Sequence, residues 1–426
     1  MPHDALIEAA AAALKSLDTA GADARRWFVP GRLEVLGKHT DYAGGRSLLC
    51  AAERGIVFAA VPRNDARVRI VDAVSGADLD FTIAPTLRSP AGHWANYPTT
   101  VARRVARNFP GPLNGADIAF ASDLPPAAGM SSSSALVVGF FTVLADINQL
   151  ERRHEYRASI HSLEELAAYL GTVENGRSFG SLAGDAGVGT AGGSEDHTAI
   201  LCCRAGALSQ YAFSPIRHER TIRLPAGWTF AIGVSGVVAD KNAAAQEAYN
   251  RAARAVDAIL HAWRAATGRS DVWLADALAS APDAMERLRE VLRGLGPPRA
   301  DALLARLEQF WAESTEIIPE AGDCLARGDV EGVGVLVDRS QRGAERWLGN
   351  QVPETVALAR GARKLGAAAA CAFGAGFGGS VWALVKTATA DDFVERWARE
   401  YRTAFPARAQ SSQFFLTLPG PGMQRL

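Results

Sequence analysis

The stretch Leu124-Pro-Pro-Ala-Ala-Gly-Met-Ser-Ser-Ser-Ser-Ala135 decides how the rest of the chain is interpreted. It joins a predicted strand, 116–122, to an apolar run, 136–147, that has the length of a helix. Four hydroxyls therefore fall on the first turn of a predicted helix, where unpaired N–H groups and the positive end of the dipole attract phosphate oxygens. A serine-rich N-cap below a core helix is the plainer alternative. One cap needs one serine, so four after Pro-Pro-Ala-Ala-Gly favour a phosphate-binding loop.

The composition is that of an ordinary globular protein. The 426 residues leave room for two domains, with 48% hydrophobic and 21% charged residues. A formal net charge of −1 offers no basic excess for nucleic-acid phosphates, so we expect no nucleic-acid partner. Five cysteines without C-x-x-C spacing indicate neither a disulfide framework nor a thiolate zinc site. No apolar run reaches the ~18 residues of a membrane span, and segment 4–17 lacks a signal-peptide pattern. We therefore expect a cytoplasmic protein without a membrane partner.

A dense polar cluster follows a short strand-like start at 27–29. Four of its side chains lie within ten residues of one another: Arg32, Lys38, His39 and Asp41. Such a cluster would be desolvated in a core, so it must face solvent or a polar pocket, and glycines at close intervals between 31 and 45 favour the pocket. The Gly37-Lys38 pair is not a P-loop, because an arginine stands where the first glycine of that motif belongs and a histidine follows the lysine.

Strand patterns at 55–61, 67–72 and 79–83 suggest a meandering sheet, and a helix is predicted from Trp94 to Asn108. Trp94 fits either the core or the wall of an adenine pocket. Farther along, a loop of Gly and Ala at 180–193 ends at Glu195-Asp196. A carboxylate there fits a ligand contact and a helix N-cap equally well.

The second half is predicted to be mostly helical after a boundary near 204–215. Its glycine-rich stretch 374–380 satisfies Gly-x-Gly-x-x-Gly, but a strand follows it instead of the helix that a dinucleotide fingerprint requires. We interpret it as a loop that approaches the phosphate cradle or a ligand closely. The segment 413–418 is predicted as a closing strand.

Taken together, these stretches resemble the GHMP kinase superfamily, and its galactokinase branch most closely. The likeness rests on Gly31-Arg32 through Tyr42, on Gly129 through Ala135 and on Gly374 through Ser380, with weaker echoes at 94–97, 173–175 and 247–251. The resemblance implies an α+β, two-domain GHMP kinase fold with the active site in the interdomain cleft. It divides the chain into 1–205 and 206–426, with strand 413–418 a candidate to return to the first domain.

The resemblance further implies ATP-dependent phosphorylation of a hydroxyl on a monosaccharide or sugar-like polyol, with Mg²⁺. ATP would be bound by the residues matching the phosphate loop and the adenine wall: Trp94, Gly129, Met130, Ser131, Ser132, Ser133 and Ser134. By the same match, Ser132 and Glu174 would hold Mg²⁺, Asp196 would accept the hydroxyl proton beside the cation Arg32, and the sugar would contact Lys38, His39, Asp41 and Tyr249. Because the Gly/Ala loop is an insertion, Asp185 is a rival for the base.

The chain departs from the family where the sugar is expected. Lys38 replaces a glutamate that accepts a hydrogen bond from the sugar, and Glu34 replaces an asparagine. A lysine only donates, so we expect a substrate shifted from galactose to a uronic acid, a keto-sugar or an oxidised cyclitol. If Lys38 points away from the substrate, a true galactokinase is the alternative. A non-catalytic sugar sensor is a third hypothesis, although it would need neither the metal ligands nor the base.

Overall fold

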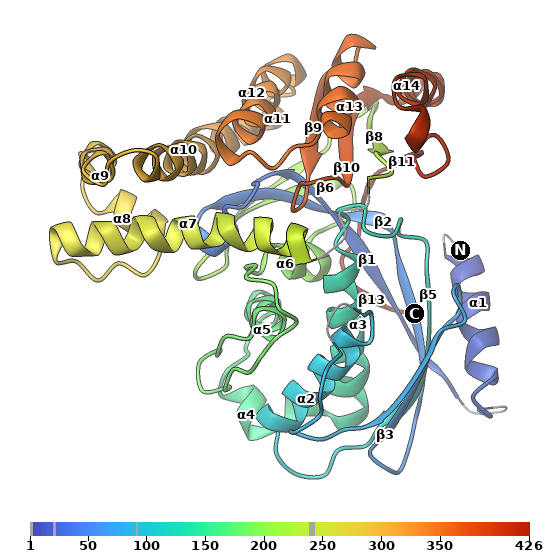
Figure 1. Ribbon diagram of the computed structural model, residues 1–426. Helices are drawn as coiled ribbons and strands as arrows, with labels where there is room; N and C mark the ends of the chain where they lie inside the picture. The colour runs from blue at the N-terminus through green and yellow to red at the C-terminus, as the bar shows by residue number, and fades with distance from the viewer. Residues whose placement is uncertain (1–2, 20–22, 91–92, 238–242) are drawn as a thin grey trace.

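The computed structural model describes residues 3–19, 23–90, 93–237 and 243–426, and it contains two antiparallel-rich sheets with helices around them (Figure 1). The larger sheet contains β1 (Arg25–Leu36), β2 (Arg46–Pro62), β3 (Arg67–Asp72), β4 (Asp78–Thr82), β5 (Ala116–Ser122), β6 (Ala207–Ala212), β7 (Arg217–Arg223), β12 (Pro419–Gly420) and β13 (Gln424–Arg425). Its main order is β13-β1-β2-β5-β3-β4, with β6 and β12 on β2 and β7 on β6. The smaller sheet has the order β11-β8-β10-β9. Its strands are β8 (Trp228–Val234), β9 (Ala369–Phe373), β10 (Ser380–Lys386) and β11 (Gln413–Thr417). The α+β class expected from the sequence is confirmed.

The two faces of the larger sheet are covered by different helices, and the alternation of the strands decides which residue meets which. α1 (Asp4–Lys15) packs on one face, against Val57, Ala59 and Ala119. Ile56, Phe58 and Ile118 point to the other face. That face carries α2 (Asn96–Asn108), α3 (Ser132–Asn148), α5 (Leu163–Asn175) and α6 (Glu195–Cys202), with the short α4 (His154–Arg157) at its rim. The apolar run predicted as a helix is α3, which lies in the middle of this layer.

The helices of the second half form two groups. α7 (Ala243–Thr267), α8 (Leu274–Ala279), α9 (Ala284–Arg293) and α10 (Arg299–Trp311) build an arm with its own hydrophobic core (Figure 1). α13 (Pro353–Lys364) and α14 (Ala390–Ala404) pack on the smaller sheet. Between these groups, α10 passes through a π-helical turn, 312–317, into α11 (Ile318–Ala326), and α12 (Val330–Gly343) follows. The helical hydrogen-bond pattern changes in this turn, which contains the buried polar residues Glu313 and Ser314.

The sheet pairing corrects the expected domain boundary. β6 and β7 lie after residue 205, yet they extend the larger sheet, so the chain enters the smaller sheet only at β8. At the other end, β11 pairs with β8 and stays in the second sheet, while the short β12 and β13 return to β2 and β1. The alternation of polar and apolar residues in a sequence indicates a strand but not the strand with which it pairs. Here the paired strands are up to several hundred residues apart in the sequence.

β1 is longer than its sequence indicated. A strand was expected only at 27–29, with turn residues after it, but the structure continues the strand to Leu36. Its register against β2 shifts between Pro30 and Arg32 and again between Glu34 and Leu36. These irregularities absorb Pro30-Gly31 without ending the strand, because a bulge tolerates residues that a regular ladder does not. Arg32 and Glu34 are consequently strand residues two positions apart.

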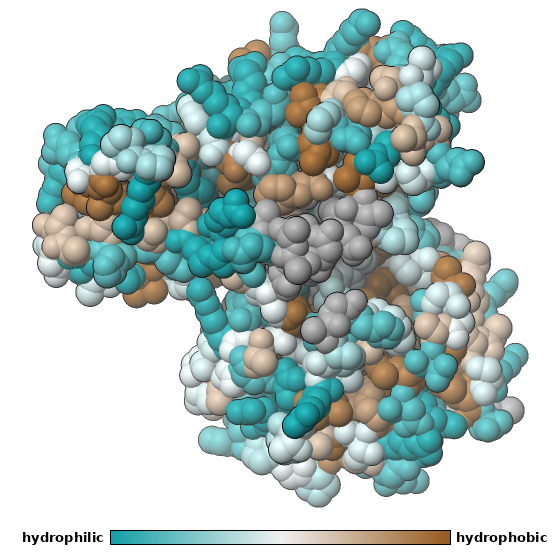
Figure 2. Space-filling model, in the orientation of Figure 1, coloured by the Kyte–Doolittle hydropathy of each residue, from teal (hydrophilic) through white to brown (hydrophobic). Residues whose placement is uncertain are grey.

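Hydrophilic side chains cover most of the face seen in Figure 2, with small separate hydrophobic patches. None of the helices that the structure describes combines the length and the apolar character needed to cross a bilayer.

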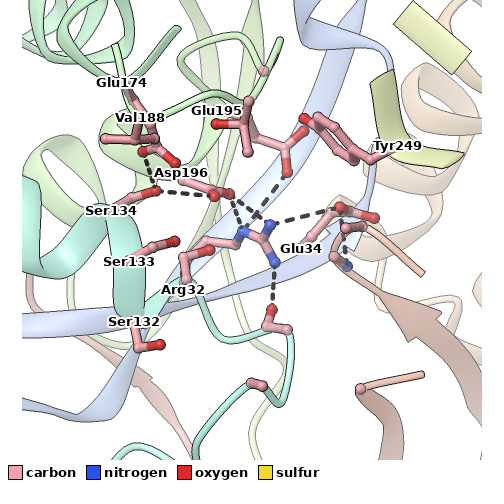
Figure 3. Close-up of a pocket in the computed structure, with 18 of the residues that line it drawn as sticks. Arg32, Glu34, Ser132, Ser133, Ser134, Glu174, Val188, Glu195, Asp196 and Tyr249 are labelled. Carbon is pink, nitrogen blue, oxygen red and sulfur yellow. Dashed lines mark hydrogen bonds and ion pairs between the residues drawn. The ribbon is translucent and has the colours of Figure 1, made fainter. Parts of the chain in front are cut away.

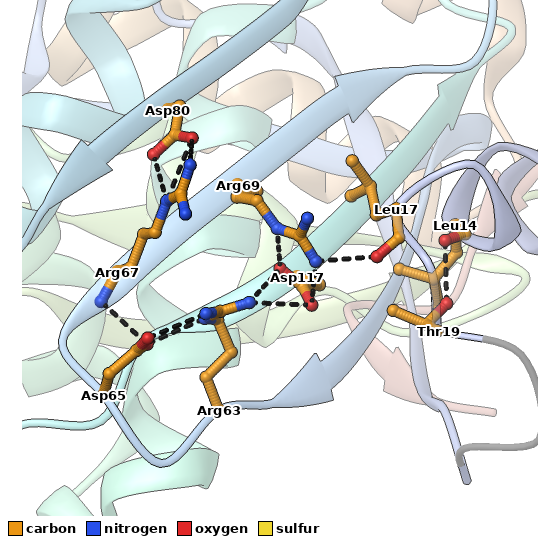
Figure 4. Close-up of polar contacts among 9 residues, drawn as sticks. All are labelled: Leu14, Leu17, Thr19, Arg63, Asp65, Arg67, Arg69, Asp80 and Asp117. Atoms are coloured by element: carbon orange, nitrogen blue, oxygen red, sulfur yellow. Dashed lines mark hydrogen bonds and ion pairs between the residues drawn. The ribbon is translucent and has the colours of Figure 1, made fainter.

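The outer edge of the larger sheet is held by a buried aspartate (Figure 4). Asp117 on β5 accepts hydrogen bonds from Arg69 Nε at 2.6 Å and from Arg63 Nη1 at 3.2 Å. Arg69 also donates to the Leu17 carbonyl oxygen at 2.6 Å, which ties the end of α1 to the sheet. The carboxylate side chain is 7% exposed, so its partners are hard for water to replace.

Replacing Asp117 should therefore destabilise the fold. We expect Asp117→Ala to lower the free energy of unfolding by about 1–3 kcal/mol, because two guanidinium groups lose a buried acceptor. Urea unfolding followed by circular dichroism measures this change. Asp80→Ala is the matched control, since the Arg67–Asp80 pair is exposed and should contribute little. Equal midpoints for the two variants would contradict the role given to Asp117.

Candidate active site

A cavity of about 520 Å³ lies where the two halves of the chain meet. The larger-sheet half contributes β1, the serine loop (124–135), the end of α5 and the start of α6. The other half contributes Tyr249 of α7 and the glycine loop (374–380). The stretches singled out in the sequence therefore converge on one interdomain cavity.

The serine loop and the glycine loop pack backbone against backbone. A Cβ atom at Gly129 would lie 3.0 Å from the last carbonyl oxygen of β9, and the φ angle of this glycine is 75°. Ser380 Oγ donates a 2.6 Å hydrogen bond to the Ala128 carbonyl oxygen. The glycines thus allow the second half of the chain to brace the loop that precedes α3.

The serine loop presents its hydroxyls to the cavity, but not its methionine. Ser131 to Ser134 line the cavity, and Ser131 has a left-handed φ of 58° just before α3 begins. The Met130 side chain is 1% exposed and packs in the core, so it does not line the cavity, and a contact of Met130 with ATP stays a prediction. Its carbonyl oxygen instead accepts a 3.1 Å hydrogen bond from the Arg32 amide, which fixes β1 to the loop.

Trp94 packs against the core and also lines the cavity, so an adenine contact stays a prediction. Its ring lies 5.7 Å from that of Phe120 in the core, and it also lines the cavity near Asn96 and Tyr97.

Glu174 and Asp196 meet at the first turn of α3 (Figure 3). Ser134 Oγ donates to Glu174 Oε2 at 2.8 Å and lies 3.3 Å from Asp196 Oδ2. His197 Nε2 is 3.3 Å from the same Glu174 oxygen. In Figure 3, Ser134 lies next to Glu174, whereas Ser132 lies at the far end of the three labelled serines. The hydroxyl beside the two carboxylates therefore belongs to Ser134.

Arg32 is the centre of the cavity floor. Its guanidinium donates from Nε to Asp196 Oδ1 at 2.7 Å and from Nη1 to the Gly129 carbonyl oxygen at 3.0 Å, and Nη2 forms an ion pair with the same Asp196 oxygen at 2.5 Å. Its side chain is 5% exposed. Burial works against the cation, but the carboxylates of Asp196, Glu34 and Glu195 raise the pKa of Arg32 above its ordinary value. Arg32 therefore stays charged next to Asp196.

Asp185, the rival for the base, lies outside the cavity lining. Its carboxylate accepts hydrogen bonds from Arg103 Nε at 2.7 Å and from the Gly187 amide at 3.0 Å, and its side chain is 3% exposed. These contacts hold the inserted Gly/Ala loop against α2. Asp185 thus fixes the loop, and Asp196 is the aspartate at the cavity.

His39, Asp41 and Tyr249 all line the cavity. The His39 and Tyr249 rings are 4.9 Å apart, and His39 Nε2 lies 3.1 Å from the Ala375 carbonyl oxygen. Burial and the nearby Arg306 lower the pKa of His39 to about 4, so this ring is neutral at pH 7. Asp41 Oδ2 accepts a 3.1 Å hydrogen bond from an α6 amide.

Lys38 does not line the cavity, which corrects its expected contact with substrate. Its side chain is buried, with Nζ 2.9 Å from Cys371 Sγ and 3.4 Å from Ser340 Oγ. Glu313, in the π-helical turn, accepts a 2.9 Å hydrogen bond from Ser340 Oγ and a 3.0 Å hydrogen bond from the Gly37 amide. Burial opposes the charge, but the neighbouring thiol and Glu313 raise the pKa of Lys38. The backbone irregularity in β1 and the turn after it aim this lysine into the second half of the chain.

Two further carboxylates line the cavity, although the sequence interpretation gave neither of them a role in the site. Glu195 is 5% exposed and accepts a 2.6 Å hydrogen bond from Ser47 Oγ, and Glu34 is 3% exposed beside Arg32. The Arg-x-Glu spacing would have placed Glu34 on the same side as Arg32 only if a continuous strand had been predicted.

Comparisons with known proteins agree with this geometry. Residues 18–62 match the galactokinase galactose-binding signature, 96–183 the GHMP kinases N terminal domain and 323–403 the GHMP kinases C terminal domain. The chain is 29% identical over 378 residues to a galactokinase of Chloroflexus aggregans, covering 86% of this chain and 85% of that protein. It is 39% identical over 125 residues to a galactokinase of Chloroflexus aurantiacus, covering 28% of this chain and 32% of that protein.

Solved structures show the same fold. Lactococcus lactis galactokinase complexed with galactose matches with a TM-score of 0.80 at 20% identity, over 98% of this chain and 99% of that chain. L. major mevalonate kinase in complex with R-mevalonate matches with a TM-score of 0.53 at 15% identity, over 93% and 96%. The chain therefore belongs to the GHMP kinase superfamily, and within it to the galactokinase branch. It is an ATP-dependent sugar kinase of that branch.

The position of Lys38 predicts an effect on folding. Lys38→Met removes the cation beside Glu313, so we expect the free energy of unfolding to fall by about 3 kcal/mol. Denaturant unfolding measures this loss, with Lys364→Met on the exposed face of α13 as the control. A variant of unchanged stability whose KM for sugar rises would return Lys38 to the substrate.

Proposed function

We propose that this protein transfers the γ-phosphoryl group of ATP to a hydroxyl of a neutral monosaccharide, with galactose as the first candidate. The observation that carries the proposal is the buried Arg32–Asp196 pair, 2.7 Å from Nε to Oδ1, facing the serine loop across one interdomain cavity. The galactokinase relatives and the galactose-binding signature support a hexose.

The residues divide the reaction between them. The triphosphate would lie at the start of α3, where Ser131 to Ser134 line the cavity and the N–H groups of the first helical turn favour an anion. Asp196 would accept the proton of the attacking hydroxyl. Arg32 would keep Asp196 ionised and offset the charge that develops on the transferred group. Phosphoryl transfer depends mainly on such positioning and charge neutralisation.

The oxygen atoms near α3 fit Mg²⁺. Within the described residues no three His, Cys, Asp or Glu side chains gather as a metal site of their own. Mg²⁺ typically takes one or two carboxylates and completes its shell with phosphates and water, and it neutralises phosphate charge when bound. Glu174 would be its carboxylate, with the Ser134 hydroxyl 2.8 Å away, so we propose Ser134 in place of Ser132 as the serine partner.

The substrate shift expected from Lys38 loses its basis. The lysine Nζ contacts Cys371 and Ser340 instead of lining the cavity beside His39, Asp41 and Tyr249, the proposed sugar end. Uronic acids, keto-sugars and oxidised cyclitols were attractive only as acceptors for that cation. His39, Asp41 and Tyr249 remain as the proposed sugar contacts, and a neutral hexose suits them.

The first test is turnover itself. We expect the purified protein with Mg²⁺ and ATP to release ADP in the presence of galactose or another neutral hexose, with a sugar phosphate identified by mass spectrometry. Binding of sugar and ATP without turnover across a broad panel would support the sensor alternative and overturn this proposal.

The role of Asp196 is tested by Asp196→Asn. Because the variant cannot accept the proton, we expect kcat to fall by about 10²–10⁴-fold while the Kd for a non-hydrolysable ATP analogue stays within a few-fold. Asp185→Asn is the matched control, since it should loosen the inserted loop and keep kcat far higher. A larger loss of kcat in Asp185→Asn than in Asp196→Asn would make Asp185 the base instead of Asp196.

The metal assignment is tested by paired serine variants. Ser134→Ala should raise the Mg²⁺ concentration for half-maximal rate by about tenfold or more, because it removes an oxygen beside Glu174. Ser132→Ala, on the same turn, should chiefly raise the KM for ATP. Mg²⁺ titrations at saturating sugar distinguish them, and the reverse pattern would favour Ser132.

A further inference from the structure

The cavity floor is rich in carboxylates and poor in cations. Its lining includes five acidic side chains: Glu34, Asp41, Glu174, Glu195 and Asp196. In the described part of the chain, Arg32 is the one arginine or lysine that lines the cavity. Four of the acids have partners that account for them, namely a serine hydroxyl, a backbone amide or Arg32 itself. Glu34 is different.

Glu34 is a buried carboxylate, and only one of its two oxygens accepts a hydrogen bond from the described residues. Oε2 accepts a long, 3.3 Å hydrogen bond from the Gly374 amide and lies 3.9 Å from Arg32 Nη2. Among the residues that the structure describes, Oε1 has no hydrogen-bond partner, although Glu34 is only 3% exposed. Arg32 does not supply the missing donor, because its nitrogens are directed to Asp196 and the Gly129 carbonyl oxygen. A buried acceptor of this kind requires a donor from elsewhere.

The position of Glu34 is at the sugar end of the cavity. In Figure 3 it lies on the other side of the Arg32 guanidinium from Asp196 and Ser134. Its amide partner belongs to the glycine loop, as does the Ala375 carbonyl oxygen that contacts His39. The phosphate-binding end is therefore separated from Glu34 by Arg32, while the proposed sugar contact His39 shares its loop.

We propose that Glu34 is a specificity-determining residue whose carboxylate accepts a hydrogen bond from a donor group of the substrate. This inference rests on the proposed function and gives the substrate a chemical class: a sugar with a hydroxyl or ammonium donor at this position, and not a sugar with a carboxylate there. A uronate would bring a second anion against the Glu34 carboxylate, whose nearest cation, Arg32, lies 3.9 Å away and already pairs with Asp196, and such like-charge contacts are unfavourable. Lys38 does not line the cavity, so its ammonium group is not placed to contact a substrate carboxylate there.

The experiment compares substrates and variants in the full-length protein. KM and kcat are measured with Mg-ATP for galactose, galactosamine and galacturonate, in wild type, Glu34→Gln and Glu34→Asn. We expect wild type to use galactose or galactosamine and to reject galacturonate. Both variants should raise the ratio of kcat/KM for galacturonate to that for galactose by about tenfold or more, because the repelling charge is gone. Glu331→Gln, on the exposed face of α12, is the control and should leave this ratio unchanged.

Binding calorimetry with the same three sugars separates the failures. If wild type turns over no sugar, the proposed function fails, while preferential binding of galactose over galacturonate that Glu34→Gln abolishes still supports Glu34. If wild type turns over galactose and Glu34→Gln changes neither KM nor the galacturonate ratio beyond twofold, the role of Glu34 is overturned and the kinase function stands. A wild-type protein that prefers galacturonate to galactose also overturns the role proposed for Glu34.

Discussion

The buried guanidinium of Arg32 is the constraint on which the rest of the site depends. It joins three elements that are distant in sequence: β1 through its own backbone, the serine loop through the Gly129 carbonyl oxygen, and α6 through Asp196. A cation that is 5% exposed is tolerated only because carboxylates surround it. The same carboxylates would be costly without it, so the positions of base, phosphate loop and sugar end are fixed together.

The second half of the chain completes the site by contact at two places. The glycine loop braces the serine loop where side chains would collide, and Ser380 closes that contact with a hydrogen bond to Ala128. Deeper in the interface, Lys38 and Glu313 take part in one buried polar network with Ser340 and Cys371. Both contacts join segments of the two halves of the chain. The distance between the serine loop and the proposed sugar contacts therefore depends on the interface between the halves and not on either sheet alone.

The two departures from the family, at positions 34 and 38, have one structural explanation. The lysine that replaces the family's glutamate turns away to a buried site, and the glutamate that replaces its asparagine occupies the cavity floor. A single substitution considered alone suggested a substrate with acceptors. The pair considered in three dimensions suggests a substrate that donates a hydrogen bond to Glu34, in place of the substrate that was expected to accept one from Lys38.

Local sequence was enough to determine the elements and the chemistry of the loops. Four serines before an apolar helix, glycines that permit close backbone approach and a carboxylate after the inserted loop are features of short segments. The expected bounds of β3, β5 and α2 agree with the structure to within two residues. Tertiary structure alone decided the continuation of β1 through Pro30-Gly31, the sheet that β6 joins, the serine that meets Glu174 and the direction of Lys38. The physical reason is the same in each case: Lys38 and Cys371 are 333 residues apart, and no local pattern states which distant group will satisfy a buried charge.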